Sequence, residues 1–273
     1  MKAQTDRQNR LREKAEKMTF MKASTLCLFM TAISAGCIDP ESFASPVAEA
    51  IPQCTNAEYL GRTIEINSES LPLTELLQPQ EVLLTFDDGP HPKRTDAMLD
   101  LLNAHCIKAI FFLRGDNALK YPEQVRRQAA EGFLQGGHSV KHDHLTELAP
   151  EVARADIQQS LENIAAAFES PAAHRPYLFR FPYFESNEDL DGYLASQGLI
   201  AVGANVSSMD WAFNTPEDIV DHVMNSLKDT GNKGVILLHE PFPYTLAATE
   251  ALINDLIAEN YRFVSVKLVE GEK

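Results

Sequence analysis

Positive charge is scarce in this sequence. Its 273 residues include 24 Lys and Arg against 39 Asp and Glu, which gives a formal net charge of −15. The imbalance lies outside the first part of the chain: residues 1–36 hold 7 Lys and Arg against 3 Asp and Glu, and the remainder holds 17 against 36. Proteins that bind nucleic acid gain much of their affinity by placing cations against phosphates. The acidic body of the chain therefore argues against a nucleic-acid partner.

A glycine-rich phosphate loop and an internal repeat are both missing. The single glycine pair, Gly136–Gly137, lacks the further spaced glycines of a dinucleotide-binding fingerprint. This pair therefore does not predict a nucleotide site.

The apolar run at residues 23–35 is too short to span a bilayer comfortably. It follows a Lys and precedes small residues, which is the pattern of a secretory signal. We therefore expect residues 1–36 to be an export segment and the protein to reach the periplasm, the cell envelope or the medium. The tetrad "SAGC" resembles the lipobox of bacterial lipoproteins, although Ser34 stands where an aliphatic residue is usual. A lipid on Cys37 would be the only membrane attachment, and a non-lipidated signal cleaved near Ala35 is the alternative.

Cysteine is rare, with four in the chain. If Cys27 leaves with the signal and Cys37 carries lipid, Cys54 and Cys106 remain and could pair in an oxidising compartment. A free, buried Cys106 beside a strand is the alternative.

Residues 37–78 are rich in Pro, Ser and Glu without a sustained period, so we expect a tether and lead-in there. Residues 79–273 form the expected globular domain, in which short apolar runs alternate with helical patterns. The expected strands are 81–86, 107–113, 177–181, 199–204, 234–239 and 261–266, and the expected helices are 95–105, 122–133, 150–170, 187–197, 215–229 and 245–260. This alternation predicts an α/β fold with a mainly parallel sheet, open or closed into a barrel.

Polar residues follow several of these apolar runs. Asp87–Asp88, Arg180 and His239 end three of them, and Asp210 comes shortly after a fourth. The carboxyl ends of parallel strands meet at one edge of a sheet or one mouth of a barrel, so these side chains are expected to lie together. Each has an ordinary structural explanation by itself, such as a turn, a salt bridge or a satisfied buried histidine.

His138 and His142 are four residues apart, which places them on one face if that turn is helical. Two imidazoles and one carboxylate make a plausible three-ligand zinc site with an open position for water. A solvated polar face is the alternative explanation.

Five segments resemble, in order, the motifs of the polysaccharide deacetylase family, which comprises the NodB homology domain proteins of carbohydrate esterase family 4. They are "TFDDGPHP", "HSVKH", "RFPY", "MDW" and "ILLH". The resemblance spans residues 80–268 and implies a distorted (β/α)7 barrel. It also implies a metal-dependent hydrolase that removes acetyl groups from N-acetylated glycans such as chitooligosaccharide, peptidoglycan or exopolysaccharide.

The same resemblance implies roles for the polar residues. Asp88, His138 and His142 would hold a divalent metal, with Zn2+ expected and Co2+, Ni2+ or Mn2+ also compatible. Asp87 would be the general base toward the attacking water, and Arg180 would keep it ionised.

His239 would be the general acid that protonates the departing amine, and Asp210 would favour its protonated form. The backbone N–H of Tyr183 would stabilise the oxyanion. The wall of the acetyl pocket would be made by Trp211, Ile236 and Leu238.

The chain departs from the family pattern in a few places. Ser207 replaces the first acid of D-x-x-D-W, and Phe184 follows "RFPY" where Gly is common, which would reshape the oxyanion loop. Glu240 is expected on the rim, and His144 is the remaining histidine best placed to support the site. The same residues would also suit an O-acetyl esterase acting on a polymer such as xylan. A non-catalytic carbohydrate-binding protein is a further alternative.

Overall fold

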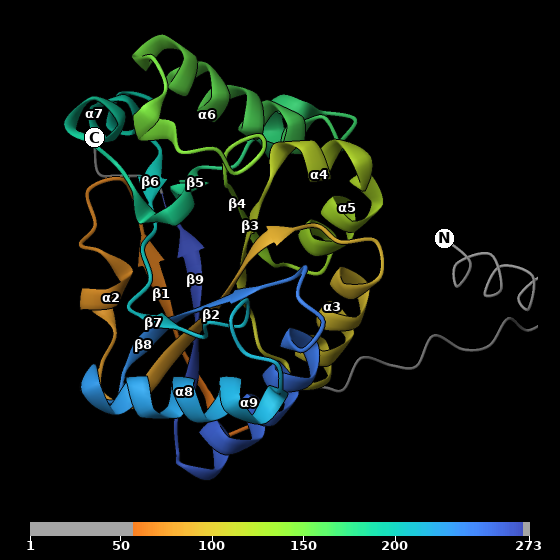
Figure 1. The fold of residues 1–273 in the computed structure, drawn as a ribbon, viewed down its shortest axis with the longest axis vertical. Helices are drawn as coiled ribbons and strands as arrows, with labels where there is room; N and C mark the ends of the chain where they lie inside the picture. The colour runs from red at the N-terminus through yellow and green to blue at the C-terminus, as the bar shows by residue number, and fades with distance from the viewer. Residues whose placement is uncertain (1–56, 270–273) are drawn as a thin grey trace, which may run out of the picture. The chain divides into compact units, whose positions relative to one another are not determined.

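The computed structural model describes residues 57–269, in which helices surround a set of parallel strands (Figure 1). The strands are β1 (Leu60–Ile66), β2 (Glu81–Gly89), β3 (Ile110–Leu113), β4 (Leu134–Gly137), β5 (Leu178–Phe179), β6 (Ile200–Ala201), β7 (Val206–Ser207), β8 (Gly234–His239) and β9 (Arg262–Leu268). The α-helices are α2 (Leu73–Leu76), α3 (Arg94–Ala104), α4 (Gly115–Lys120), α5 (Pro122–Ala130), α6 (Pro150–Ala165), α7 (Glu188–Ser196), α8 (Pro216–Asp229) and α9 (Thr245–Ala258). Within residues 57–269, no helix is long and apolar enough to cross a membrane.

The strand pairing follows a ring. Successive pairs join β6 to β5, β4, β3, β2, β8 and finally β7, and all of these pairs are parallel. Among the described residues β6 and β7 do not pair, so the ring is open at that point. β9 pairs with the start of β2 and carries β1 on its other side. The α/β fold with a parallel sheet is confirmed, and the order of the seven strands fits the distorted barrel.

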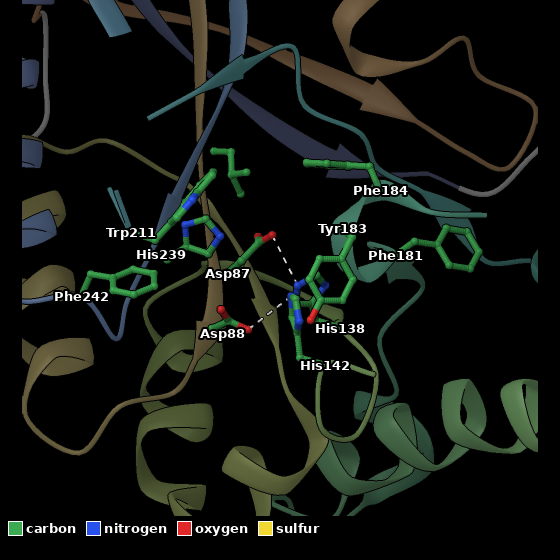
Figure 2. Close-up of a pocket in the computed structure, with 11 residues that line it drawn as sticks. Asp87, Asp88, His138, His142, Phe181, Tyr183, Phe184, Trp211, His239 and Phe242 are labelled. Carbon is green, nitrogen blue, oxygen red and sulfur yellow. Dashed lines mark ion pairs between the residues drawn. The ribbon is translucent and has the colours of Figure 1, made fainter. Parts of the chain in front are cut away.

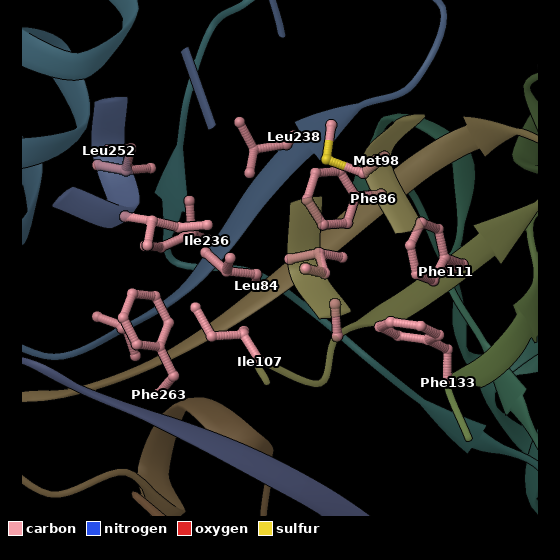
Figure 3. Close-up of a cluster of buried hydrophobic side chains, with 14 of the residues drawn as sticks. Leu84, Phe86, Met98, Ile107, Phe111, Phe133, Ile236, Leu238, Leu252 and Phe263 are labelled. Carbon is pink, nitrogen blue, oxygen red and sulfur yellow. The ribbon is translucent and has the colours of Figure 1, made fainter. Parts of the chain in front are cut away.

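Side chains along β2 alternate between two apolar environments, as in any strand buried on both faces. Leu84 and Phe86 pack outward against α3 and α9, in the cluster that Figure 3 shows. Leu83 points the other way, into a second cluster with Phe112 and Leu178 of neighbouring strands. Asp87 continues this inward series at the end of the strand, which is why it opens into the mouth of the ring.

The packed domain begins earlier than the sequence predicted. Residues 57–78 are not a tether: β1 pairs with β9, and Ile64, Ile66, Leu73 and Leu77 all join the inward-facing cluster. Only two apolar residues alternate cleanly in β1, so the strand has little periodic signal of its own. The export segment and Cys37 lie outside the described residues.

β4 was also missed, because its sequence is Leu-Gln-Gly-Gly. A Cβ atom on Gly136 would lie 2.6 Å from the ring of Phe112, so glycine is required by close packing there. The sequence predicted neither α4 nor β7, and it predicted a strand over residues 199–204 that is longer than β6.

Cys106 is disulfide-bonded, so the alternative of a free cysteine is wrong. Cys54 lies outside the described residues.

Candidate active site

Asp87 lies at the carboxyl end of β2, directly opposite His239 at the end of β8 in the strand register. Its side chain is buried, and its Oδ1 accepts a hydrogen bond of 2.7 Å from the Arg180 guanidinium. The strands of the ring thus bring three of the predicted site residues together from positions 87, 180 and 239.

Arg180 fills the centre of the ring beneath Asp87. Its guanidinium also donates to the Thr85 hydroxyl and to the carbonyls of residues 202–203, and it stacks on the Phe112 ring at 4.1 Å. Burial nevertheless raises the pKa of Asp87, and the charges of Arg180 and His239 only partly oppose this. The predicted pairing of Arg180 with Asp87 is present, and it opposes the effect of burial on the carboxyl pKa.

Asp88, His138 and His142 form a compact cluster of potential metal ligands. One donor atom from each lies within 4.8 Å of the others. The turn that carries the two histidines is not helical. It instead places Ser139 and His142 at positive φ, and the Ser139 hydroxyl accepts the backbone N–H of His142 at 2.7 Å. This turn, rather than one face of a helix, brings the two imidazoles together.

The chemistry of this cluster fits a divalent cation. The backbone carbonyl of Arg180 lies 2.7 Å from Nδ1 of His138, which leaves Nε2 free to act as a ligand. Burial lowers the pKa of His138 to about 3, so the imidazole is neutral, as metal binding requires. The buried Oδ1 of Asp88 makes no hydrogen bond, and Asn117 fixes the backbone of Asp88 by donating to its carbonyl at 2.9 Å. An unpaired carboxylate oxygen beside two imidazoles is a site that a cation would satisfy.

His239 is held by Asp210 through two contacts. Nδ1 of His239 lies 2.7 Å from Oδ1 of Asp210, and the backbone N–H of His239 donates to Oδ2 at 2.8 Å. The Thr245 hydroxyl donates to the same Oδ2 at 2.7 Å. Burial lowers the pKa of His239, but the hydrogen bond and charge of Asp210 outweigh it, and the pKa is raised. Asp210 therefore favours the protonated form of the His239 imidazole.

These groups open into one pocket of about 520 Å³ (Figure 2). Figure 2 shows the carboxylates and imidazoles at its centre, with aromatic side chains on two sides. The pocket is lined by Asp87, Asp88, His138, His142, Phe181, Tyr183, Phe184, Trp211, Leu237, His239 and Phe242.

A family profile described as "Polysaccharide deacetylase" matches residues 76–202. A chitooligosaccharide deacetylase from Bradyrhizobium sp. (strain ANU 289) is 32% identical over 165 residues, which cover 60% of this chain and 72% of that protein. The chain belongs to the polysaccharide deacetylase family.

Two further relatives show the extent of the likeness. The peptidoglycan-N-acetylmuramic acid deacetylase PdaC of Bacillus subtilis (strain 168) is 33% identical over 206 residues, which cover 75% of this chain and only 42% of that longer protein. The structure of a family 4 carbohydrate esterase from Streptomyces lividans, in complex with acetate, matches with a TM-score of 0.59 and 32% identity. That match covers 70% of this chain and 93% of the other.

Two residues predicted to wall the pocket do not reach it. Ile236 and Leu238 are fully buried in the outward cluster, where they pack toward the helices (Figure 3). Since His239 points into the ring, alternation along β8 turns Leu237 inward and its two neighbours outward. The "ILLH" segment itself therefore predicts that Leu237, rather than Ile236 or Leu238, faces the pocket. Trp211 does line the pocket, and Phe181 and Phe242 are aromatic lining residues that the sequence did not single out.

The loop after β5 carries Tyr183, whose ring lines the pocket and lies 4.5 Å from the ring of His142. The His144 ring stacks on the Tyr183 ring, with a centroid distance of 3.8 Å, and Nδ1 of His144 lies 2.8 Å from Oε2 of Glu185. His144 therefore contacts Tyr183 of the pocket and is not one of the three clustered residues Asp88, His138 and His142. Tyr183 and Phe184 both have positive φ, 57° and 58°.

Two departures from the family pattern have plain structural outcomes. The Ser207 hydroxyl accepts the backbone N–H of Met209 at 3.3 Å and so supports the turn that leads to Asp210. Glu240 is not on the rim: it is buried beneath Gly89, whose Cβ, if present, would lie 1.3 Å from Oε2 of Glu240. The backbone N–H of Glu240 donates to the carbonyl of Asp87, which turns this side chain under the loop instead of toward solvent.

Proposed function

We propose that this protein hydrolyses the acetamide groups of N-acetylated glycans of the N-acetylglucosamine type. The observation that carries the proposal is the convergence of a buried carboxylate, a three-ligand cluster and an Asp-supported imidazole in one pocket. The relatives named above are deacetylases of chitooligosaccharide and of peptidoglycan, which supports this substrate class.

Asp88, His138 and His142 would hold the divalent cation, with Zn2+ favoured by the two imidazoles and one carboxylate. When bound, such an ion polarises the acetyl carbonyl and acidifies a water molecule beside it. Asp87 lies next to the ligands, with its Oδ2 at 3.6 Å from Nε2 of His138, and would accept the proton of the attacking water. Arg180 holds the other oxygen of this carboxylate and so aims the free one at the cluster.

His239 would give its proton to the sugar nitrogen as the carbon–nitrogen bond breaks. This proton is needed because the sugar nitrogen departs readily as a neutral amine but not as an anion. Water thus supplies the oxygen of the released acetate, and the glycan keeps a free amine. The backbone N–H of Tyr183 would stabilise the negative charge that develops on the carbonyl oxygen.

We further propose that the protein acts outside the cytoplasm. The signal-like residues 1–36 support this, and so does the disulfide at Cys106, because disulfides persist mainly in oxidising compartments. A lipid anchor at Cys37 would hold the domain at the cell envelope, with residues 38–56 as the connection.

Acetate release from chitotetraose, peptidoglycan, N-acetylated exopolysaccharide and acetylxylan tests the proposal. Wild-type protein should release acetate from at least one N-acetyl glycan, and Asp87→Asn should release at least about 100-fold less while it still binds metal. Release from acetylxylan alone would instead support the O-acetyl esterase. Glycan binding without turnover above the Asp87→Asn level would support the non-catalytic alternative.

A further inference from the structure

Phe184 has an unusual backbone for its residue type. It ends the short 3-10 turn η4 (Pro182–Phe184), and its φ of 58° follows the φ of 57° at Tyr183. This left-handed region favours glycine, and a bulky side chain there is strained. Residues with such backbone strain occur mainly at functional sites, where the position of the side chain matters more than local stability.

Core packing does not explain the Phe184 ring. The side chain is 48% exposed and belongs to none of the apolar clusters formed by residues 57–269. Its ring centroid lies 5.6 Å from the guanidinium of Arg180, near the outer limit of a cation–π contact. Phe112 already covers that guanidinium at 4.1 Å. Phe184 therefore combines a strained backbone with an exposed aromatic ring.

The position of the ring suggests what it serves. Tyr183 lies against His142, beside the reactive groups, and Phe184 is one residue farther along the same wall of the pocket. In Figure 2, Trp211 and Phe242 stand on the other side of the carboxylates and imidazoles. Trp211 is also about half exposed, at 49%. Exposed aromatic side chains that line a concave site are typical of ligand contacts.

We propose that Phe184 is a specificity residue that stacks on the apolar face of the pyranose ring next to the sugar whose acetamide reacts. A pyranose presents a face of C–H bonds, and a flat aromatic ring provides a large apolar surface for it at little entropic cost. The inference rests on the proposed function, and it adds a preference for oligosaccharides over single sugars.

Two variants that tolerate positive φ remove the ring without backbone strain: Phe184→Gly and Phe184→Asn. For chitotetraose, each should raise KM and weaken binding measured by calorimetry about 3- to 10-fold, with kcat within about 2-fold of wild type. Phe184→Trp keeps an aromatic face and should restore most of the affinity. Activity on a small N-acetylated monosaccharide should be the same in all of these proteins.

Two matched controls separate the ring from its backbone. Asn260→Gly changes another exposed residue with positive φ, far along the chain after α9, and Tyr177→Ala removes another exposed aromatic ring. Both should leave KM and kcat unchanged. The Tm of Phe184→Gly should not fall, because relief of strain offsets the lost contacts.

A lower Tm together with a lower kcat would overturn the proposal, since it would mean that Phe184 mainly shields Arg180. Equal chitotetraose affinity in Phe184→Gly and wild type would also overturn it. Calorimetry keeps the two proposals distinguishable: absence of acetate release from wild type defeats the proposed function, while the affinity difference tests Phe184 independently of turnover.

Discussion

The Asp210 carboxylate contacts both the imidazole ring and the backbone N–H of His239. Oδ1 lies 2.7 Å from Nδ1 of the imidazole, and Oδ2 accepts the backbone N–H of the same residue at 2.8 Å. One carboxylate therefore sets both the direction of the ring, with Nε2 toward the pocket, and its affinity for a proton.

Asp210→Asn should shift the basic limb of the pH profile of kcat/KM to lower pH. Asp210 raises the pKa of His239 through a hydrogen bond and a negative charge, and the amide supplies no charge. A general acid with a lower pKa loses its proton at a lower pH, so activity near neutral pH should fall about 10-fold or more. An acetate-release assay between pH 5 and about 10 measures this.

Thr245→Val is the matched control for Asp210. It removes the hydroxyl that donates to Oδ2 of Asp210 but keeps the carboxylate. Its pH profile should change much less than that of Asp210→Asn. An unshifted basic limb in Asp210→Asn would show that His239 is not the acid of the reaction.

Asn117→Ala should weaken metal binding without removing a ligand. The Asn117 amide donates to the backbone carbonyl of Asp88, whose φ of 67° belongs to a tightly constrained loop. Loss of such supporting contacts commonly costs about 10- to 100-fold in metal affinity. Competition with a metal-binding dye measures the affinity, and Asn225→Ala on the exposed face of α8 serves as the control. Equal affinity in Asn117→Ala and wild type would contradict the supporting role.

Much of the site was predictable because parallel strands end together. Asp87, Arg180 and His239 each follow an apolar run. The structure brings Asp87 and His239 to one mouth of the ring and places Arg180 directly against Asp87. The prediction that Ile236 and Leu238 wall the pocket is wrong, because the inward direction of His239 and the alternation of side chains along β8 turn both of them outward.

Other features have no local signal. β4 is Leu-Gln-Gly-Gly, whose glycines are explained only by the Phe112 ring that packs against them. The burial of Glu240 depends on Gly89 from another strand, and the place of β1 depends on β9 at the far end of the chain. Such long-range packing cannot be recognised from the spacing of residues in one segment.

The alternation along β8 gives a paired test with Leu237 and Leu238. Leu237→Ala enlarges the pocket and should change KM for N-acetyl glycans. It should lower the free energy of unfolding less than Leu238→Ala does. Leu238→Ala leaves a cavity in the outward cluster and should reduce the free energy of unfolding by about 2–5 kcal/mol with KM unchanged. Urea unfolding and acetate-release kinetics on both variants provide the comparison; a larger KM effect from Leu238→Ala would contradict the assigned orientation.

Glu240→Gln should make the metal-free protein less sensitive to pH. Burial raises the pKa of Glu240 to about 8 from an ordinary value of 4.5, and neither carboxyl oxygen has a hydrogen-bond partner among the described residues. The folded state therefore keeps a proton that the unfolded state has lost. Between pH 4.5 and about 8 this linkage should reduce the free energy of unfolding of the wild type progressively, by on the order of 5 kcal/mol in total.

The neutral amide cannot ionise, so the stability of Glu240→Gln should exceed that of wild type most clearly at pH 8 and above. Urea unfolding of chelator-treated samples at about pH 5 and about pH 8.5 makes the comparison. These two pH values lie near the ends of the range over which Glu240 titrates. Parallel pH dependence in the two proteins would mean that Glu240 titrates normally.

The most direct test of the account is acetate release from chitotetraose and peptidoglycan before chelation, after chelation and after metal is added back. A chelator should abolish release, and Zn2+ or another divalent ion should restore it. His138→Ala and His142→Ala should not be restored at the same ion concentration. Undiminished release from the demonstrably metal-free protein would contradict the central claim that Asp88, His138 and His142 hold a metal on which deacetylation depends.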